Sequence, residues 1–193
     1  MSFKISLIDG SPVWDSLPVA KIVSYPLEAR DYKPYAQARI CISPKSVWVR
    51  LWAFEALPSE TSTLSVSLNL YPEDGEKFIW LSVNHKGVQS CKAVVGNSRT
   101  SLSEQMLLPR IKLFNSEDLQ GIYWGVVFEL PRSVLTKLYG KNELAVGKIV
   151  RGNFYKTDTG DCSEHYGCFY NVDFCDNNPY GSKFFGDFEL VTY

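Results

Sequence analysis

The sequence predicts an all-β protein that folds as an antiparallel β-sandwich with one or two short helices. Apolar and polar residues alternate with period two in many short segments, turn-forming residues separate these segments, and a single segment carries helix signals. The chain has 193 residues, enough to bury a hydrophobic core without metal or disulfide crosslinks. We expect one domain over residues 1–193.

The period-two alternation is clearest where Leu64, Val66 and Leu68 alternate with Ser65 and Ser67. Since successive side chains of a strand point to opposite faces, this pattern is typical of a strand with one buried and one polar face. Similar patterns and runs of β-branched and aromatic residues predict strands at 36–42, 47–54, 64–70, 78–84, 88–95, 122–130, 144–155 and 184–192.

Turn-forming sequences separate these strands at 43–46 (Ser-Pro-Lys-Ser), 72–75 (Pro-Glu-Asp-Gly) and 84–87 (Asn-His-Lys-Gly). The segment 131–139 predicts a helix, because Pro131 stands at its start and Gly140 follows its end. The polar segment 96–105 is expected to be a long loop.

The composition argues against two classes of partner. The formal net charge is −1 and no basic patch is visible, so we expect no nucleic acid partner. No run of eighteen apolar residues exists, so we expect no membrane partner. The apolar run near the N-terminus is too short for a signal peptide. We therefore expect a cytoplasmic protein, or a secreted one if a leader has been removed.

The cysteines are odd in number and irregularly spaced, which argues against a disulfide framework. They lie at Cys41, Cys91, Cys162, Cys168 and Cys175. Together with His165, the last three could close a tetrahedral zinc site, but zinc ligands usually come in two pairs across a longer loop. Free thiols and no structural zinc are the favoured interpretation.

Catalytic signatures are weak. A cysteine nucleophile beside His165 would need a lowered pKa and an orienting group, and sequence proximity supplies neither. A glycoside hydrolase needs two carboxylates at a defined separation, and no motif ties a pair together. No phosphate-binding loop, dinucleotide fingerprint, metalloprotease motif or serine-hydrolase elbow is present. We assign no catalytic residue and leave the enzyme question open, with a non-enzyme favoured and a hydrolase-related protein as the enzymatic option.

Aromatic residues make up 14% of the chain, and several lie on the strand face opposite the aliphatic residues. Trp48, Trp52 and Phe54 share one such face, and Trp80 lies on another. Tryptophan can stack on a pyranose ring while arginine and asparagine bind its hydroxyls. The same pattern also fits central strands that are buried on both sides.

Three segments of the C-terminal third carry a resemblance to a known family: 151–156 (Arg-Gly-Asn-Phe-Tyr-Lys), 165–167 (His-Tyr-Gly) and 184–186 (Phe-Phe-Gly). Together they resemble the C-terminal signature of family-9 carbohydrate-binding modules. Weaker similarity is seen at 47–51 with Glu55 and at 78–84 with Gly87, so the resemblance runs patchily from about residue 35 to residue 190. It implies a β-sandwich of immunoglobulin-like or DOMON-like jelly-roll type that binds sugars through aromatic contacts.

The resemblance also implies a set of ligand-binding residues. These are Trp80, Arg151, Asn153, Tyr155, His165, Tyr166 and Phe169, with the aromatic residues stacking on the sugar and Arg151, Asn153 and His165 binding its hydroxyls. Carboxylates that the family uses for hydroxyls or calcium are absent from 63–67, Trp80 and Ser82 replace an Asn and a Glu, and Phe169 replaces a Trp. We therefore expect no metal and no other cofactor.

Three functions follow from these observations. The first is a non-catalytic saccharide-binding module that resembles those attached to xylan- or cellulose-degrading enzymes, with a saccharide ligand and such an enzyme as partners. The second is a cytoplasmic structural or protein-interaction sandwich that has lost sugar binding. The third and weakest is a carbohydrate-active hydrolase. A solvent-open groove lined by Trp80, Tyr155 and Phe169 would favour the first.

Overall fold

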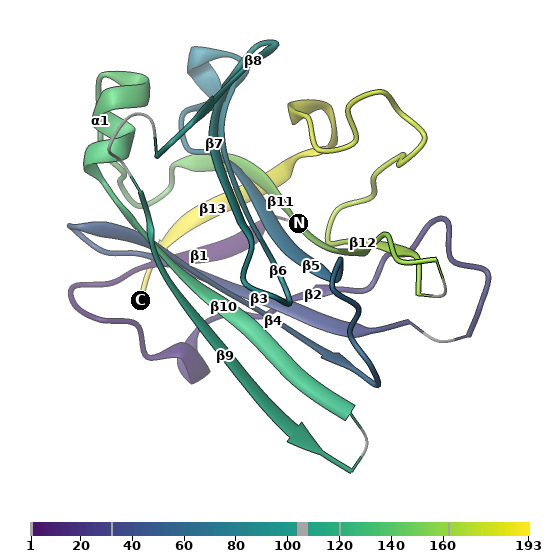
Figure 1. Cartoon of the computed structure of the whole chain (residues 1–193). Helices are drawn as coiled ribbons and strands as arrows, with labels where there is room; N and C mark the ends of the chain where they lie inside the picture. Colours follow the sequence, from purple (N-terminus) through teal and green to yellow (C-terminus); the bar gives the residue numbers. More distant parts are fainter. Residues whose placement is uncertain (1, 32, 104–107, 120, 162) are drawn as a thin grey trace.

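The protein is a β-sandwich made by one strongly curled sheet, as seen in a computed structural model that describes residues 2–31, 33–103, 108–119, 121–161 and 163–193 (Figure 1). Its strands are β1 (Phe3–Leu7), β2 (Ala20–Ile22), β3 (Tyr35–Ile42), β4 (Ser46–Glu55), β5 (Thr63–Asn69), β6 (Lys77–Asn84), β7 (Gln89–Val95), β8 (Ser98–Ser101), β9 (Arg110–Asp118), β10 (Gly121–Pro131), β11 (Ile149–Asp158), β12 (His165–Cys168) and β13 (Gly186–Thr192). The helical elements are α1 (Ser133–Tyr139) and the 3-10 turns η1 (Trp14–Ser16), η2 (Pro72–Asp74) and η3 (Ser182–Phe184).

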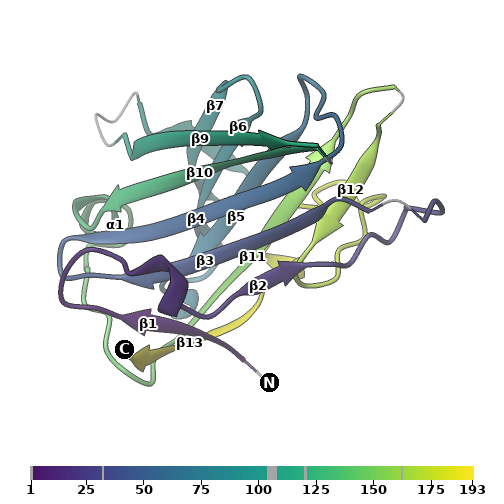
Figure 2. The same ribbon diagram turned by 90° about the horizontal axis from the view of Figure 1, so that it is seen from below.

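The strand order is β8-β7-β6-β5-β11-β13-β1-β3-β4-β10-β9, with β12 paired to β11 and β2 paired to β3. β11 connects the two parts of this path, because residues 149–152 pair with β13 and residues 151–157 pair with β5. The sheet thus folds into two layers, visible in Figures 1 and 2. We call β5, β6, β7, β8, β11 and β12 the β6 layer, and the remaining strands the β4 layer.

The pairing is antiparallel except at β1, which runs parallel to both of its neighbours, β13 and β3. The predicted all-β sandwich is therefore confirmed, with a parallel strand that the sequence did not predict. None of the helices in the described part of the chain has the length and apolar composition needed to span a membrane.

The core lies between the two layers and is built by the period-two alternation. Leu64, Val66 and Leu68 of β5 and Val49 and Leu51 of β4 point inward and are 0–1% exposed. Burying one such side chain stabilises the fold by about 1.5–3 kcal/mol. The same alternation turns the polar and aromatic residues of these strands outward, and this places the candidate site on an outer face.

The predicted elements are confirmed at most positions, including the helix, which ends at Gly140 in a left-handed conformation (φ 72°). Two predictions were wrong. Residues 144–148 do not belong to a strand, because Gly147 adopts φ 83° and β11 begins only at Ile149. The expected loop at 96–105 contains β8, whose residues are polar but pair with β7.

Candidate functional site

A pocket of about 190 Å³ lies on the outer face of the β6 layer. The alternation of β6 places it there: Ile79 and Leu81 face the core, so Phe78 and Trp80 face outward. Its walls come from three strands and one loop, and the lining residues are Phe78, Trp80, Lys92, Val94, Arg99 and Tyr180.

The strand register brings these residues together. Trp80 of β6 lies directly across from Lys92 of β7, and Phe78 lies across from Val94. Val94 in turn faces Arg99 of β8. Two neighbouring rows of the sheet therefore each place an apolar residue beside a cationic side chain.

The Trp80 and Tyr180 rings line the pocket and form its aromatic floor, and the Tyr155 ring packs against them. The Trp80 and Tyr180 rings are 4.8 Å apart between centroids and tilted by 54°. Tyr155 lies beneath both, 5.8 Å from Trp80 and 5.1 Å from Tyr180, and is 0% exposed. Burial raises the pKa of Tyr155 and of Tyr180, so both phenols are neutral at pH 7. The floor is thus an uncharged aromatic platform with Trp80 half-buried at its surface.

Asn153 holds the loop that carries Tyr180. Its side-chain amide donates to the backbone oxygens of Tyr170 and Phe184, at 2.9 and 3.1 Å. Its carbonyl oxygen accepts from the backbone N–H groups of Tyr170 and Phe154, each at 2.9 Å. All four hydrogen-bonding positions of this fully buried amide are used, so Asn153 fixes the loop and has no capacity left for a ligand.

Arg151, on strand β11, contacts the C-terminal end of the same loop. Its guanidinium donates to the backbone oxygen of Phe185 at 2.6 Å and pairs with Asp187 at 3.4 Å. It does not line the pocket. The family resemblance assigned Arg151 to sugar hydroxyls, but in this structure its guanidinium binds groups of the protein at the end of the loop.

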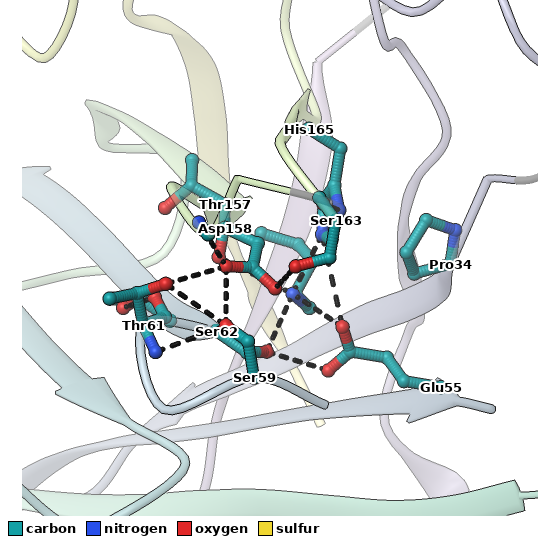
Figure 3. Close-up of polar contacts among 12 residues, drawn as sticks. Pro34, Glu55, Ser59, Thr61, Ser62, Thr157, Asp158, Ser163 and His165 are labelled. Atoms are coloured by element: carbon teal, nitrogen blue, oxygen red, sulfur yellow. Dashed lines mark hydrogen bonds and ion pairs between the residues drawn. The ribbon is translucent and has the colours of Figure 1, made fainter. Parts of the chain in front are cut away.

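His165 lies elsewhere, in a buried polar centre formed by Glu55, Ser62, Trp124, Lys156 and His165. Figure 3 labels Glu55, Ser62 and His165 of this centre. The Lys156 ammonium is 0% exposed and reaches Glu55 at 3.0 Å, Ser62 at 2.9 Å and His165 Nε2 at 2.8 Å. Glu55 also accepts hydrogen bonds from Trp124 Nε1 at 2.6 Å and Ser62 at 2.7 Å. Every charged group of the polar centre therefore has a partner inside the protein.

The protonation state of His165 follows from these contacts. Burial and the neighbouring Lys156 ammonium lower the pKa of His165, and burial also lowers that of Lys156. A neutral imidazole accepts the Lys156 hydrogen bond at Nε2 and donates from Nδ1 to the Ser163 backbone oxygen at 2.6 Å. His165 thus acts here as a structural acceptor.

Asp158 forms a second polar cluster beside the polar centre (Figure 3). It accepts hydrogen bonds from Ser59 (2.6 Å), Thr61 (2.7 Å), the Gly160 N–H (2.9 Å) and Ser163 (2.8 Å). Burial alone would raise the pKa of Asp158, but these four donors outweigh it and lower the pKa to about 2. The carboxylate is charged and fully engaged.

Glu55, Asp158 and His165 place their ligand atoms within 4.8 Å of one another, a spacing that metal ligands show. The Lys156 ammonium lies between Glu55 and His165 and supplies positive charge there. The zinc set weighed from the sequence is not assembled in the described residues: Cys168 contacts the Ser24 backbone oxygen and Cys175 is exposed. Cys162 lies outside the described residues.

The last two predicted residues also lie away from the pocket. Tyr166 donates to Glu164 at 2.8 Å and lines a separate, more open hollow of about 430 Å³. Phe169 packs into the aromatic part of the core, 5.4 Å from Phe3 and 4.7 Å from Tyr170. Of the seven predicted residues, Trp80 lines the pocket and Tyr155 supports it.

Tyr180, Lys92 and Arg99 were missed by sequence reasoning. Lys92 gave a usable signal, because it occupies the outward face of a predicted strand between Ser90 and Val94. Tyr180 and Arg99 gave none, since a loop and a short polar strand bring them to Trp80.

Comparison with known proteins points to one architecture. No protein-family model matches the sequence, and a search of curated proteins finds no significant match. Among solved structures, a candidate carbohydrate-binding protein from Bacteroides uniformis is similar with a TM-score of 0.73 at 14% identity, over 98% of both chains. A family-9 carbohydrate-binding module from Caldicellulosiruptor kristjanssonii is similar with a TM-score of 0.67 at 11% identity, over 100% of this chain. That module was solved with cellotriose, where 95% of it is covered, and with glucose, where 97% is covered.

The chain has the fold of a family-9 carbohydrate-binding module. This confirms the fold that the sequence resemblance implied. At such low identity the similarity concerns the course of the chain and not individual side chains. The function of the pocket lined by Trp80 and Tyr180 must therefore be argued from its own geometry.

Proposed function

We propose that the chain is a non-catalytic saccharide-binding module and that the Trp80–Tyr180 pocket is its binding site. The observation that carries this proposal is the tilted Trp80–Tyr180 ring pair beside two cationic side chains in an open pocket. A pyranose has an apolar face that stacks on an aromatic ring and hydroxyls that accept hydrogen bonds from cations. The sugar complexes of the similar family-9 module support the proposal.

The non-catalytic part of the proposal rests on the chemistry of the pocket lining. Its charged residues are Lys92 and Arg99, and none of its six lining residues is a carboxylate. Hydrolysis of a glycosidic bond uses two carboxyl groups that flank it. Glu55 and Asp158 are close to each other, but both are buried and hydrogen-bonded by the protein's own groups. We place them in the structure of the sandwich and not in chemistry on a sugar.

The wider role that fits such a module is targeting. We propose that it holds a polysaccharide-degrading enzyme, such as one acting on xylan or cellulose, near its substrate. The resemblance of segments 151–156, 165–167 and 184–186 to family-9 modules supports this role.

Isothermal titration with glucose, cellotriose, xylotriose and uronic acid glycosides tests the binding function. We expect at least one of these saccharides to bind. Trp80→Ala should then weaken binding by about 1–3 kcal/mol because stacking area is lost, and Tyr180→Ala should weaken it in the same direction. Trp80 is half-buried, so each variant is titrated well below its own melting temperature.

Trp52→Ala is the matched control. Trp52 is also a half-buried tryptophan on an outer face, but it lies on the β4 layer, 5.4 Å from Tyr35 and 5.9 Å from Tyr123. It should leave saccharide affinity unchanged. If no saccharide binds, or if Trp52→Ala abolishes binding while Trp80→Ala does not, the proposal is wrong. The protein-interaction alternative would then be favoured, because Trp52 belongs to an aromatic outer face.

A further inference from the structure

The charged side chains that line the Trp80–Tyr180 pocket are both positive. Lys92 and Arg99 line it, and no acidic side chain of the described residues does. Cations elsewhere in the described chain commonly have acidic partners: Lys141 lies 2.9 Å from Asp74, and Lys183 lies 2.8 Å from Asp176. The pocket therefore has an excess of positive charge that the local structure does not neutralise.

Neither pocket cation is engaged by a carboxylate of the described residues. Lys92 makes no ion pair or side-chain hydrogen bond with them, and the Arg99 guanidinium donates to the neutral side-chain oxygen of Asn178 at 2.9 Å. That single contact anchors the guanidinium and leaves other N–H donors for a ligand. Anchoring of this kind reduces the entropy that the side chain loses on binding.

The positions of the two cations relative to the aromatic floor complete the geometry. Lys92 is the cross-strand neighbour of Trp80, so the two side chains leave the same face of the sheet next to each other. Arg99 stands across from Val94, in the next row of the same outer face. A ring lying on Trp80 would therefore have an ammonium and a guanidinium along one edge. A carboxylate is the group that a guanidinium fork and an ammonium together bind best.

We propose that the saccharide of this pocket carries a carboxylate, as a uronic acid does, with its ring on Trp80 and its carboxylate toward Lys92 and Arg99. This inference rests on the proposed saccharide-binding function. No carboxylate in the described part of the chain offsets these two cations, so a neutral sugar would leave them without a counter-charge from those residues, whereas a uronate supplies one in a partly desolvated pocket.

Matched glycosides test the proposal with intact protein. Methyl β-D-glucuronide differs from methyl β-D-glucoside in carrying a carboxylate in place of a hydroxymethyl group, and the galacturonide and galactoside form a second such pair. We expect at least one acidic glycoside to bind about tenfold more tightly than its neutral counterpart at low ionic strength. High salt should reduce this preference because it screens exposed charges.

Two variants test whether Lys92 and Arg99 cause the preference for acidic over neutral glycosides. Lys92→Gln and Arg99→Gln should each reduce it severalfold, because each should weaken binding of the acidic glycoside more than binding of its neutral counterpart. Both side chains lack acidic partners among the described residues, so both variants should keep the wild-type circular dichroism spectrum. Lys112→Gln is the control, because Lys112 is an exposed cation on the edge strand β9 of the other layer. It should leave the preference unchanged.

The possible failures are distinguishable. If a neutral glycoside binds as tightly as its acidic counterpart, and binding still depends on Trp80, the acidic-sugar inference is wrong and the proposed function stands. An acidic preference that survives both Lys92→Gln and Arg99→Gln also overturns the inference. If neither member of either pair binds, and the saccharides of the wider panel fail as well, both proposals are wrong.

Discussion

The polar centre and the Trp80–Tyr180 pocket differ in whether the protein's own groups compensate the charge of their lysine. Each combines a lysine with a tryptophan, and each draws on the β6 layer. In the polar centre, Lys156 is fully buried, and its ammonium contacts Glu55, Ser62, His165 and the Thr157 backbone oxygen. In the pocket, Lys92 is half-buried and has no acidic partner among the described residues.

The difference separates a structural from a binding role. A buried charge is tolerated when protein groups compensate it, and its removal is felt as lost stability. An open cation beside an aromatic ring costs little in the free protein, because water solvates it, and can be compensated by a ligand. Variants in the polar centre should therefore change stability, and variants in the pocket should change affinity.

The largest effect is expected for Lys156→Met. Removing the ammonium leaves the Glu55 carboxylate buried without its counter-charge, which costs about 3–5 kcal/mol of the free energy of unfolding. Urea unfolding at pH 7 measures it. Lys4→Met is the control, because the Lys4–Glu189 pair is solvent-exposed and should contribute at most about 1 kcal/mol. Equal small losses in the two variants would contradict a structural role for the polar centre.

Asn153→Ala should have the next largest effect on the free energy of unfolding, and it should combine a structural effect with an effect on binding. The backbone groups of Tyr170 and Phe184 would lose their buried partner, at a cost on the order of 3 kcal/mol. Because the same loop carries Tyr180, saccharide affinity should fall as well. A variant with full stability and reduced affinity would show that Asn153 contacts the ligand directly, as the sequence predicted.

Protonation of Asp158 should make the free energy of unfolding depend on pH between about pH 4 and pH 2. Its pKa falls from an ordinary 3.8 to about 2 on folding, so the folded state favours the ionised carboxylate. Its contribution is complete above about pH 4 and is lost as the pH falls toward 2. We expect Asp158→Asn to cost about 2 kcal/mol at pH 7 and to flatten the stability profile between these pH values. An unchanged acid profile would contradict this assignment.

The smallest effect is expected for Arg151→Gln. The Arg151–Asp187 pair is partly exposed, so the loss of stability should be below about 1 kcal/mol. Saccharide affinity should stay within about twofold of wild type, because Arg151 does not line the pocket. A loss of affinity comparable to that of Trp80→Ala would place Arg151 in the site, as the sequence resemblance implied.

Much of the fold could be predicted because period-two alternation is a local signal. It identified the strands β3, β4, β5, β6, β7 and β10, but it missed β1, β2 and the nine-residue β9. It did not identify β8 or β12, each four residues long, because these are defined by pairing with β7 and β11 and not by composition. The parallel pairing of β1 with β13 joins the two ends of the chain, and no local pattern encodes it.

The site was harder to predict, because its members meet only across strands and loops. Trp80 stood out as an aromatic residue on the outward face of a predicted strand, and Tyr155 was implied by the family resemblance. The pairing of Trp80 with Lys92 depends on register, and its contact with Tyr180 depends on the loop that Asn153 fixes. The partnership of Glu55 with Lys156 likewise joins two strands from opposite layers.

The most direct test of the account observes the indole N–H signals of the five tryptophans in one NMR spectrum. Trp80 reports on the pocket, Trp124 on the polar centre, and Trp52 on the outer face of the β4 layer. Methyl β-D-glucuronide and cellotriose are titrated separately. The account predicts that the Trp80 signal moves in a saturable manner while the Trp124 and Trp52 signals stay in place. Saturable movement of the Trp52 signal with Trp80 unchanged, or no movement of any signal with either saccharide, would contradict it.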